Sequence, residues 1–268
     1  LLIKRQECDV RFGFAPGRTS RKYATGPRVR QHGLKPGWRT SVPLVSNLAI
    51  LFAIVGPLTW LAVRDHRARQ MSRRGLLDDC TRLFDRHALT HDGDSFPRLS
   101  GRCATRNVDV RLISDGMTIR RLPQLWLQVT VRERLDVESE LAVLVRPSGY
   151  EFYSLTSGFD HIIEVPPSFP REVIVRGRSS RAERLFERTA GTMAEILADP
   201  RVKEIAVTRE GMRIIRQADE GRRGDYLLLR QAVFDNASVS AEDLDAVLRE
   251  IDALRASILT PSRELQRA

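Results

Sequence analysis

The sequence predicts an α+β protein: a single N-terminal transmembrane helix followed by one soluble domain with a mainly antiparallel sheet and two or three helices. Three observations lead to this fold class. No residue from Thr40 to Val63 is charged, strand-like segments joined by turn signals recur between residues 96 and 234, and helical apolar patterns follow Ser180 and Ser240. Together they divide the chain into an apolar helix and a folded domain.

The overall composition is that of a globular protein with a basic beginning. The 268 residues are 42% hydrophobic and 29% charged, which is typical neither of a disordered chain nor of a protein with many membrane spans. The formal net charge is +10, and residues 1 to 63 contribute +8 through ten Lys and Arg residues against Glu7 and Asp9. The basicity therefore belongs to a tail beside the apolar helix rather than to a folded surface, and it predicts no nucleic-acid partner.

Two residue counts bear on source and redox state. Arginine outnumbers lysine forty to four, and Lys203 is the only lysine after the apolar segment. This bias indicates the base composition of a bacterial genome rather than guanidinium chemistry. The three cysteines, Cys8, Cys80 and Cys103, are too few and too scattered for a disulfide framework. A single Cys80–Cys103 bridge stays open for an exported domain.

The apolar segment from Val42 to Val63 is long enough to cross a bilayer. Its 22 residues correspond to about 33 Å of helix. Twelve of them are Leu, Ile, Val or Phe, which together favour insertion by about 4 to 7 kcal/mol before polar residues are counted. Trp38 and Trp60 fall near the two expected interfaces, and Pro57 predicts a kink that membrane helices tolerate.

A buried core helix and a cleavable signal peptide are the alternatives for this segment. A core helix rarely runs so far without a charge, and basic residues flank both ends here. A signal peptide needs a shorter apolar run and a small-x-small cleavage site, which the sequence after Trp60 does not offer. We therefore expect a single-pass protein of the cell inner membrane, with the lipid bilayer as its partner through residues 42–63.

The charges on either side of the segment leave its orientation nearly balanced. Within 20 residues of the segment, five basic residues precede it and six arginines follow it: Lys22, Arg28, Arg30, Lys35 and Arg39, then Arg64, Arg67, Arg69, Arg73, Arg74 and Arg82. Residues 1 to 40 show no periodicity, and the chain begins with Leu. If that stretch is not native, the arginines dominate and the soluble domain faces the cytoplasm, which is the orientation we expect.

The sequence divides into five predicted regions. Residues 1–41 form a basic tail without regular structure, 42–63 the transmembrane helix, 64–95 a helical stalk, 96–260 the α+β domain and 261–268 a C-terminal tail. The stalk is predicted from apolar residues at three- and four-residue steps, and the turn-forming residues 90 to 95 end it. The stripe consists of Leu76, Leu77, Cys80, Leu83, Phe84 and His87.

Alternating and continuous apolar runs predict the strands of the domain. One hairpin is expected from Val108–Ile113 and Met117–Leu122, and another from Lys203–Thr208 and Met212–Gln217. Further strands are predicted at Leu125–Val131, Leu141–Val145, His161–Val165, Glu172–Arg176 and Tyr226–Phe234.

Two helices are predicted with their caps and buried faces. Ser180 and Glu183 have the spacing of a capping box, and Ser240 caps the second helix with Val239 placed to contact Leu244. The first buried face is expected to hold Ala182, Leu185, Phe186, Thr189, Met193, Ile196 and Leu197. The second is expected to hold Leu244, Val247, Leu248, Ile251, Leu254 and Ile258.

Few residues suggest chemistry. Cys80, His87, His91 and Cys103 form the best metal candidate, but their spacing matches no paired zinc knuckle, and ordinary packing explains Cys80 and His87. Residues 91–94 lack the ligand ladder of a calcium loop. Gly221–Gly224 could cradle an anion but fits better as a connection, and Trp126 fits the core. Arg120, Arg121 and Arg146 are expected at solvated strand ends, as a basic rim that could touch anionic lipid.

The functional hypotheses follow from this scarcity of motifs. No nucleophile elbow, phosphate-binding loop, dinucleotide fingerprint or zinc-protease motif is present in the sequence. We therefore predict no catalytic, cofactor-binding or metal-binding residues. The first hypothesis is a membrane-tethered binding or scaffolding domain with a possible protein partner. The alternative is a membrane-anchored enzyme, hydrolytic or metal-dependent, whose site is not recognisable.

Overall fold

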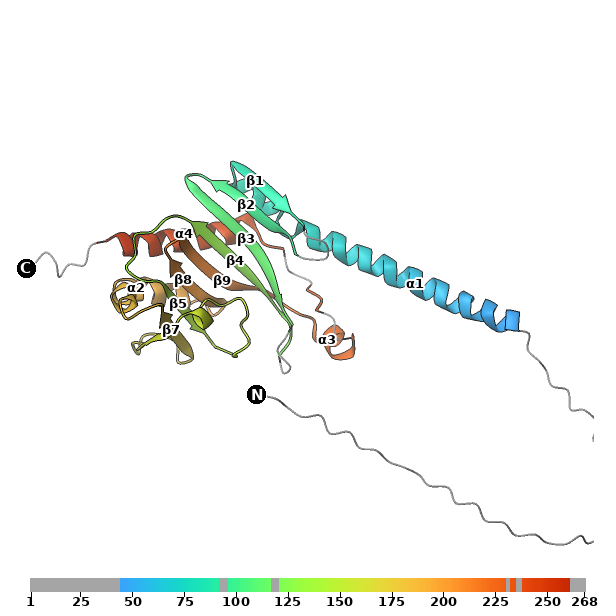
Figure 1. The fold of residues 1–268 in the computed structure, drawn as a ribbon. Helices are drawn as coiled ribbons and strands as arrows, with labels where there is room; N and C mark the ends of the chain where they lie inside the picture. The colour runs from blue at the N-terminus through green and yellow to red at the C-terminus, as the bar shows by residue number, and fades with distance from the viewer. Residues whose placement is uncertain (1–43, 92–95, 117–120, 230–231, 235–237, 261–268) are drawn as a thin grey trace, which may run out of the picture. The chain divides into compact units, whose positions relative to one another are not determined.

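The structure is a computed structural model that describes residues 44–91, 96–116, 121–229, 232–234 and 238–260. A nine-stranded antiparallel sheet with the strand order β1-β2-β3-β4-β9-β8-β5-β7-β6 forms the domain (Figure 1). Together with its helices the sheet confirms the predicted α+β class. The strands are β1 Arg86–Thr90, β2 Arg98–Cys103, β3 Arg106–Asp115, β4 Gln124–Arg132, β5 Leu141–Val145, β6 His161–Ile163, β7 Val173–Gly177, β8 Val202–Thr208 and β9 Gly211–Glu220.

Helix α1 (Leu44–Arg74) contains the apolar segment. Its residues Asn47–Asp65 are long and apolar enough to cross a membrane, and none of this window is buried within the protein. Leu48, Phe52 and Trp60 are 52%, 69% and 62% exposed. The predicted segment begins at Val42, two residues before the helix, and positions 42 and 43 lie outside the described residues.

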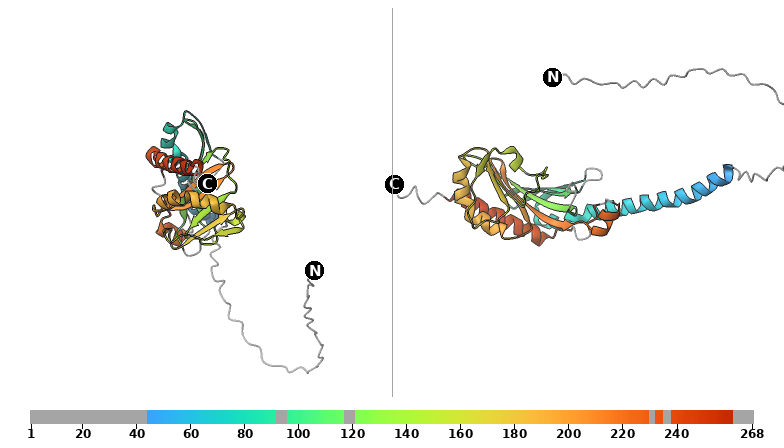
Figure 2. Two further views of the ribbon diagram at one scale, coloured as in Figure 1. Left: turned by 90° about the vertical axis from the view of Figure 1, so that its left-hand side faces the viewer. Right: turned by 90° about the horizontal axis from the view of Figure 1, so that it is seen from below.

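Helices α2 (Ala182–Leu197) and α4 (Ala241–Leu259) pack against each other and cover one face of the sheet. Figure 2 shows them, in gold and red, on the same side of the strands. All thirteen residues predicted for the two buried faces are buried. The spacing of apolar residues was sufficient to predict which side chains are buried, because each helix buries only one face.

One predicted helix cap forms and the other does not. Ser240 Oγ accepts a hydrogen bond from the backbone N–H of Asp243 at 3.0 Å, which confirms the cap of α4. The capping box at Ser180 is wrong, because α2 begins after Arg181 without a side-chain cap. The Glu183 carboxylate instead lies 2.7 Å from Nε2 of His161 on the edge strand β6, so a tertiary contact replaces the local one.

The helical stalk predicted to continue past residue 74 is wrong from that point on. Two short 3-10 helices, Gly75–Leu77 and Asp79–Leu83, follow α1, and Arg86–Thr90 then forms β1 beside β2. The apolar stripe is buried by tertiary packing: Leu77 and Cys80 are fully buried in the main core, and Cys80 Sγ lies 3.3 Å from the Val239 carbonyl. The free energy gained by burying these side chains against the sheet domain outweighs the local preference for a continuous helix that their spacing indicates.

The pairing of β1 with β2 requires a glycine. A Cβ placed on Gly101 would lie 2.1 Å from the Arg86 carbonyl oxygen, a distance that no side chain tolerates. His87, which the sequence analysis placed on a helical stripe, is the register partner of Gly101 and is exposed on this strand.

Most of the remaining strands agree with the sequence analysis. The hairpin of β8 and β9 is confirmed, as are β4, β5, β6 and β7 with small shifts at their ends. β3 pairs with β4 from Asn107 to Asp115. The strand predicted at Met117–Leu122 falls mostly on residues 117–120, which lie outside the described residues, and residues 121 and 122 are not in a strand.

The strand predicted at Tyr226–Phe234 is wrong. Its first part belongs to helix α3 (Arg223–Leu229), and residues 232–234 are not in a strand. The reason is topological, because β9 already has β4 and β8 as neighbours and leaves no free edge for the segment that follows it.

The two faces of the sheet differ in chemistry. The face under α2 and α4 is apolar and continuous with the main core. On the opposite face the register places Asp109, Thr130 and Arg213 in one row, and Arg111, Gln128 and Ile215 in the next. This second face is where polar side chains of four neighbouring strands, β2, β3, β4 and β9, meet.

The packing of residues 75–90 predicts where a soluble fragment must begin. A fragment of residues 75–260 should unfold cooperatively in urea, whereas one of residues 96–260 lacks Leu77, Cys80, Phe84 and β1. The loss of several buried side chains should destabilise the shorter fragment by more than about 4 kcal/mol or make it insoluble. Equal urea midpoints for the two fragments would show that residues 75–95 are not part of the folded domain.

Candidate functional site

The connection between β5 and β6 covers one half of the polar sheet face. Tyr153 packs beside Trp126 of β4, with ring centroids 5.9 Å apart, and Ile215 joins this cluster. Phe159 packs on Ala142 and Ala206 further along the face. Trp126 is buried, as predicted, although on the face opposite the main core. Residues 146–160 therefore act as a cover, and we call them the covering segment.

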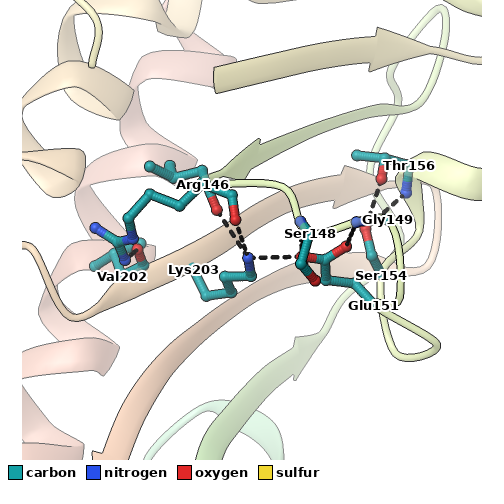
Figure 3. A network of polar contacts seen from close by, with 9 residues as sticks. Arg146, Ser148, Gly149, Glu151, Ser154, Thr156, Val202 and Lys203 are labelled. Atoms are coloured by element: carbon teal, nitrogen blue, oxygen red, sulfur yellow. Dashed lines mark hydrogen bonds and ion pairs between the residues drawn. The ribbon is translucent and has the colours of Figure 1, made fainter. Parts of the chain in front are cut away.

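A buried ion pair holds the start of the covering segment (Figure 3). Lys203 Nζ donates to the carbonyls of Val145 and Arg146, at 3.0 and 2.7 Å, and to Glu151 Oε1 at 2.8 Å. The side chains of Lys203 and Glu151 are each only 4% exposed. Because all three ammonium hydrogens have acceptors, Lys203 serves a structural role and has no lone pair for chemistry.

The other bonds of Glu151 shape a tight turn. Its Oε1 accepts from the backbone N–H and the hydroxyl of Ser148, at 2.6 and 2.8 Å, and its Oε2 accepts from the Gly149 N–H at 2.9 Å. Gly149 has φ +83°, and Arg146 has φ +50°. Burial alone would raise the pKa of Glu151, but the hydrogen bonds from Lys203 and Ser148 outweigh it and lower the pKa to about 2.

A bulge in β8 directs two consecutive charged side chains to the covering segment. The register with β9 shifts between Val202 and Glu204, so Lys203 is an extra residue in the strand. The fully buried Glu204 then accepts from the Leu155 N–H at 3.3 Å and pairs with Arg213 Nη2. In a regular strand Lys203 and Glu204 would point to opposite faces.

Next to the covering segment the polar face is hollowed into a groove of about 800 Å³. Its floor is formed by β3, β4 and β9, and its wall includes Leu155 of the covering segment. Six of the lining residues are arginines, from strands and from the turns at their ends. They are Arg98, Arg111, Arg132, Arg134, Arg209 and Arg213.

Three of these arginines have a carboxylate partner. Arg98 Nε donates to Asp109 Oδ2 at 3.0 Å, and Arg132 Nη2 lies 3.7 Å from the same oxygen. Arg213 pairs with Glu204 below the groove and also donates to the Tyr153 carbonyl at 3.2 Å. Asp109 and Glu204 are thus already committed within the protein.

Arg111 lies at the centre of the groove without an ion pair to any described carboxylate. Its Nη2 donates to the neutral Gln128 Oε1 at 2.8 Å. Burial lowers the pKa of Arg111, and the nearby charge of Arg213 lowers it further, against the opposing effect of Asp109. A partly desolvated guanidinium held in this way can bind an anion.

Unsatisfied polar atoms concentrate on the same face. Among the described residues, buried side-chain atoms without a hydrogen-bond partner include Nε of Arg111 and of Arg213 and Oε2 of Glu204. Buried polar groups are nearly always paired with protein, water or ligand, so the Nε–H groups of Arg111 and Arg213, which line the groove, are donors available to water or to a ligand.

The structure gives the four residues of the metal candidate different environments. Cys80 is in the main core, and burial raises its pKa to about 12, so the thiol stays protonated. Cys103 is buried at the end of β2, whereas His87 and His91 are exposed and His91 Nε2 lies 3.3 Å from the Arg74 carbonyl. The described residues contain no group of three or more His, Cys, Asp or Glu that could hold a metal ion.

The other motifs from the sequence also have local roles. The backbone N–H of Gly221 donates to the Pro123 carbonyl at 2.7 Å, and that of Arg222 to the Val233 carbonyl at 2.9 Å. These amides are therefore occupied, as expected for a connection. Residues 92–94 and Arg120 lie outside the described residues. Arg121 is exposed as predicted, but Arg146 is partly buried and donates to the Val202 carbonyl at 3.0 Å.

Comparisons with known proteins leave the function open. No family model and no curated protein matches the chain. One matching solved structure is the crystal structure of the mycobacterial trehalose monomycolate transport factor A, TtfA, with 11% sequence identity and a TM-score of 0.39. The match covers 70% of this chain and 96% of that chain. A likeness this distant carries no functional information.

The ion pair between Glu151 and Lys203 is the basis of a stability prediction. Glu151→Gln keeps the size of the side chain but leaves the Lys203 ammonium buried without a counter-charge. We expect a loss of about 3 kcal/mol in the free energy of unfolding at neutral pH, measured by urea titration. Replacing both partners, as Glu151→Gln with Lys203→Met, should recover part of the loss because no charge then remains buried.

The control for this pair is Glu138→Gln, which removes an exposed pair with Arg184 and should cost less than about 1 kcal/mol. The folded-state pKa of Glu151 lies below its ordinary value of 4.5, so the unfolded state binds more protons and stability falls as the pH drops from 4.5 toward 2. Glu151→Gln should lack this part of the acid sensitivity. An equal cost for Glu151→Gln and Glu138→Gln would contradict the structural role.

Proposed function

We propose that this protein is a membrane-tethered binding module. The helix of residues 42–63 spans the cell inner membrane once, and the sheet domain presents the arginine groove as its ligand site. The bilayer is then one partner, and a protein of the same membrane is a second possible partner. The observation that carries the binding function is Arg111 in the groove: its guanidinium is partly desolvated and has a neutral partner, Gln128, but no ion pair among the described residues.

The exposure of α1 supports the anchor. Every residue from Asn47 to Val63 is exposed, and none of the Asn47–Asp65 window is buried within the described part of the protein, so apolar side chains cover the helix on all sides. Water is a poor solvent for such a surface, whereas the hydrocarbon core of a bilayer matches both its length and its composition.

The groove supports binding better than catalysis. A general base must be able to reach a substrate proton, but the Asp109 carboxylate is already engaged by Arg98 and Arg132 within the protein. Most of the other charged side chains that line the groove are arginines, which suit the binding of an anion.

The anchor predicts how the chain partitions. The full chain should stay in the membrane pellet after carbonate extraction, whereas the double variant Phe52→Arg and Ile54→Arg should appear in the soluble fraction. Each arginine near the helix centre costs about 2.5 to 3.5 kcal/mol on insertion, which together offsets the gain from the apolar residues. The matched control, Phe52→Leu with Ile54→Val, should remain in the pellet. Extraction of the unmodified chain by carbonate would overturn the anchor.

The same proposal places the sheet domain in the cytoplasm. Within 20 residues of the apolar segment, six arginines follow it and five basic residues precede it, a margin of one that favours this orientation only slightly. A reporter that is active only in the cytoplasm, fused after Ala268, should be active, and one that is active only outside should be silent. The opposite pair of results would reverse the orientation.

A further inference from the structure

The groove carries more positive charge than its carboxylates balance. Its lining holds six arginines but only Asp109, Glu133 and Glu210 as acids. Glu133 is engaged by Arg255 of α4, through bonds of 2.7 and 2.6 Å. Arg213 is paired with Glu204 beneath the groove, so the other five arginines face two available carboxylates, Asp109 and Glu210, an excess of three. The residues after position 63 together carry only +2.

The register concentrates this charge in a small area. Arg98 of β2 and Arg111 of β3 are direct cross-strand partners, and like charges in such positions repel each other. Arg213 lies two strands away on the same face, opposite Thr130 of β4. Three guanidinium groups from three strands thus lie close together on the sheet: Glu204 pairs with Arg213 and Asp109 with Arg98, which leaves the charge of Arg111 without an ion pair among the described residues.

The site is built into the fold rather than formed by loose surface residues. Arg213 is 8% exposed and is fixed by Glu204 and by the Tyr153 carbonyl, yet its Nε has no partner. Arg111 is oriented by Gln128, which itself donates to the Thr130 hydroxyl at 3.2 Å. Cationic groups held in position before a ligand arrives lose little conformational entropy on binding.

We infer that the groove binds a phosphate group that carries close to two negative charges, with Arg111 as its central contact. This inference rests on the proposed function, since it takes the groove to be the ligand site. A phosphate offers three acceptor oxygens and a charge near −2 at neutral pH, which matches several guanidinium forks better than a single carboxylate does. The groove of about 800 Å³ also leaves room beside Leu155 and Met212 for an apolar part of the ligand.

Two sources can supply this group, namely a soluble phosphate ester and the headgroup of an anionic phospholipid. The chemistry that recognises them is the same. The experiment therefore uses the full chain in nanodiscs of phosphatidylcholine and offers pyrophosphate in solution, or added vesicles of phosphatidylcholine with and without phosphatidic acid.

Calorimetric titration with pyrophosphate should show saturable binding that Arg111→Gln weakens by about 10- to 100-fold. Arg209→Gln, at the exposed rim of the groove, should weaken it less, and it provides a second variant if Arg111→Gln unfolds. The matched control is Arg249→Gln on α4, outside the groove, where Arg249 pairs with Asp245 at 3.1 Å. It should bind like the unmodified chain.

The vesicle arm identifies the source. Co-flotation with phosphatidic acid vesicles that is lost in Arg111→Gln supports a lipid headgroup, and its absence alongside pyrophosphate binding supports a soluble ester. Pyrophosphate binding that is absent, or unchanged in both groove variants, overturns the inference. Succinate binding as tight as that of pyrophosphate, with the same dependence on Arg111, overturns the phosphate assignment but keeps the groove as the ligand site. The carbonate extraction test fails or succeeds independently of these results.

Discussion

Burial of Lys203 against Glu151 is the constraint on which the polar side of this domain depends. A charge pair with 4% exposure is stable only when its hydrogen bonds are complete, and here the ammonium and the carboxylate together take part in six. Those bonds fix the turn after β5, which in turn lays the covering segment over the polar face of the sheet. The carbonyl of Tyr153 then orients Arg213, and Leu155 forms the wall of the groove. The ion pair between Lys203 and Glu151 thus links the bulge in β8 to the shape of the groove.

The sheet separates stability from binding. Its apolar face, with α2 and α4, supplies the continuous core, so the other face is free to carry unpaired charge without loss of the fold. The elements that form the apolar core could be predicted from the sequence. The periodicity of apolar residues identified both helix faces, the hairpin of β8 and β9, and the central strands. It failed where tertiary contacts compete with local patterns. Cys80 and its neighbours have a helical period but are buried as 3-10 turns, and the run after Arg223 has strand-like composition but no free sheet edge.

The candidate groove could not be read from the chain. Genome base composition already explains the excess of arginine over lysine, so the arginines gave no signal of a site. The net charge after residue 63 is also small, because carboxylates elsewhere in the domain balance the arginines of the groove. Alternation in β3 and β4 does place Arg111, Gln128 and Arg132 on one face, but the same pattern describes an ordinary solvated face. No sequence pattern predicts the bulge at Lys203. Because the bulge was not predicted, neither the ion pair between Lys203 and Glu151 nor the burial of Glu204 could be predicted.

The central claim is that the groove around Arg111 is a built site for an anion. Nuclear magnetic resonance of the arginine Nε–H groups, with ¹⁵N-labelled arginine in the full chain, tests it most directly during a titration with pyrophosphate. The account predicts saturable shifts for Nε–H of Arg111 and Arg213, while that of Arg249 stays in place. Weak shifts spread evenly over exposed arginines, without saturation and without preference for the groove, would contradict it.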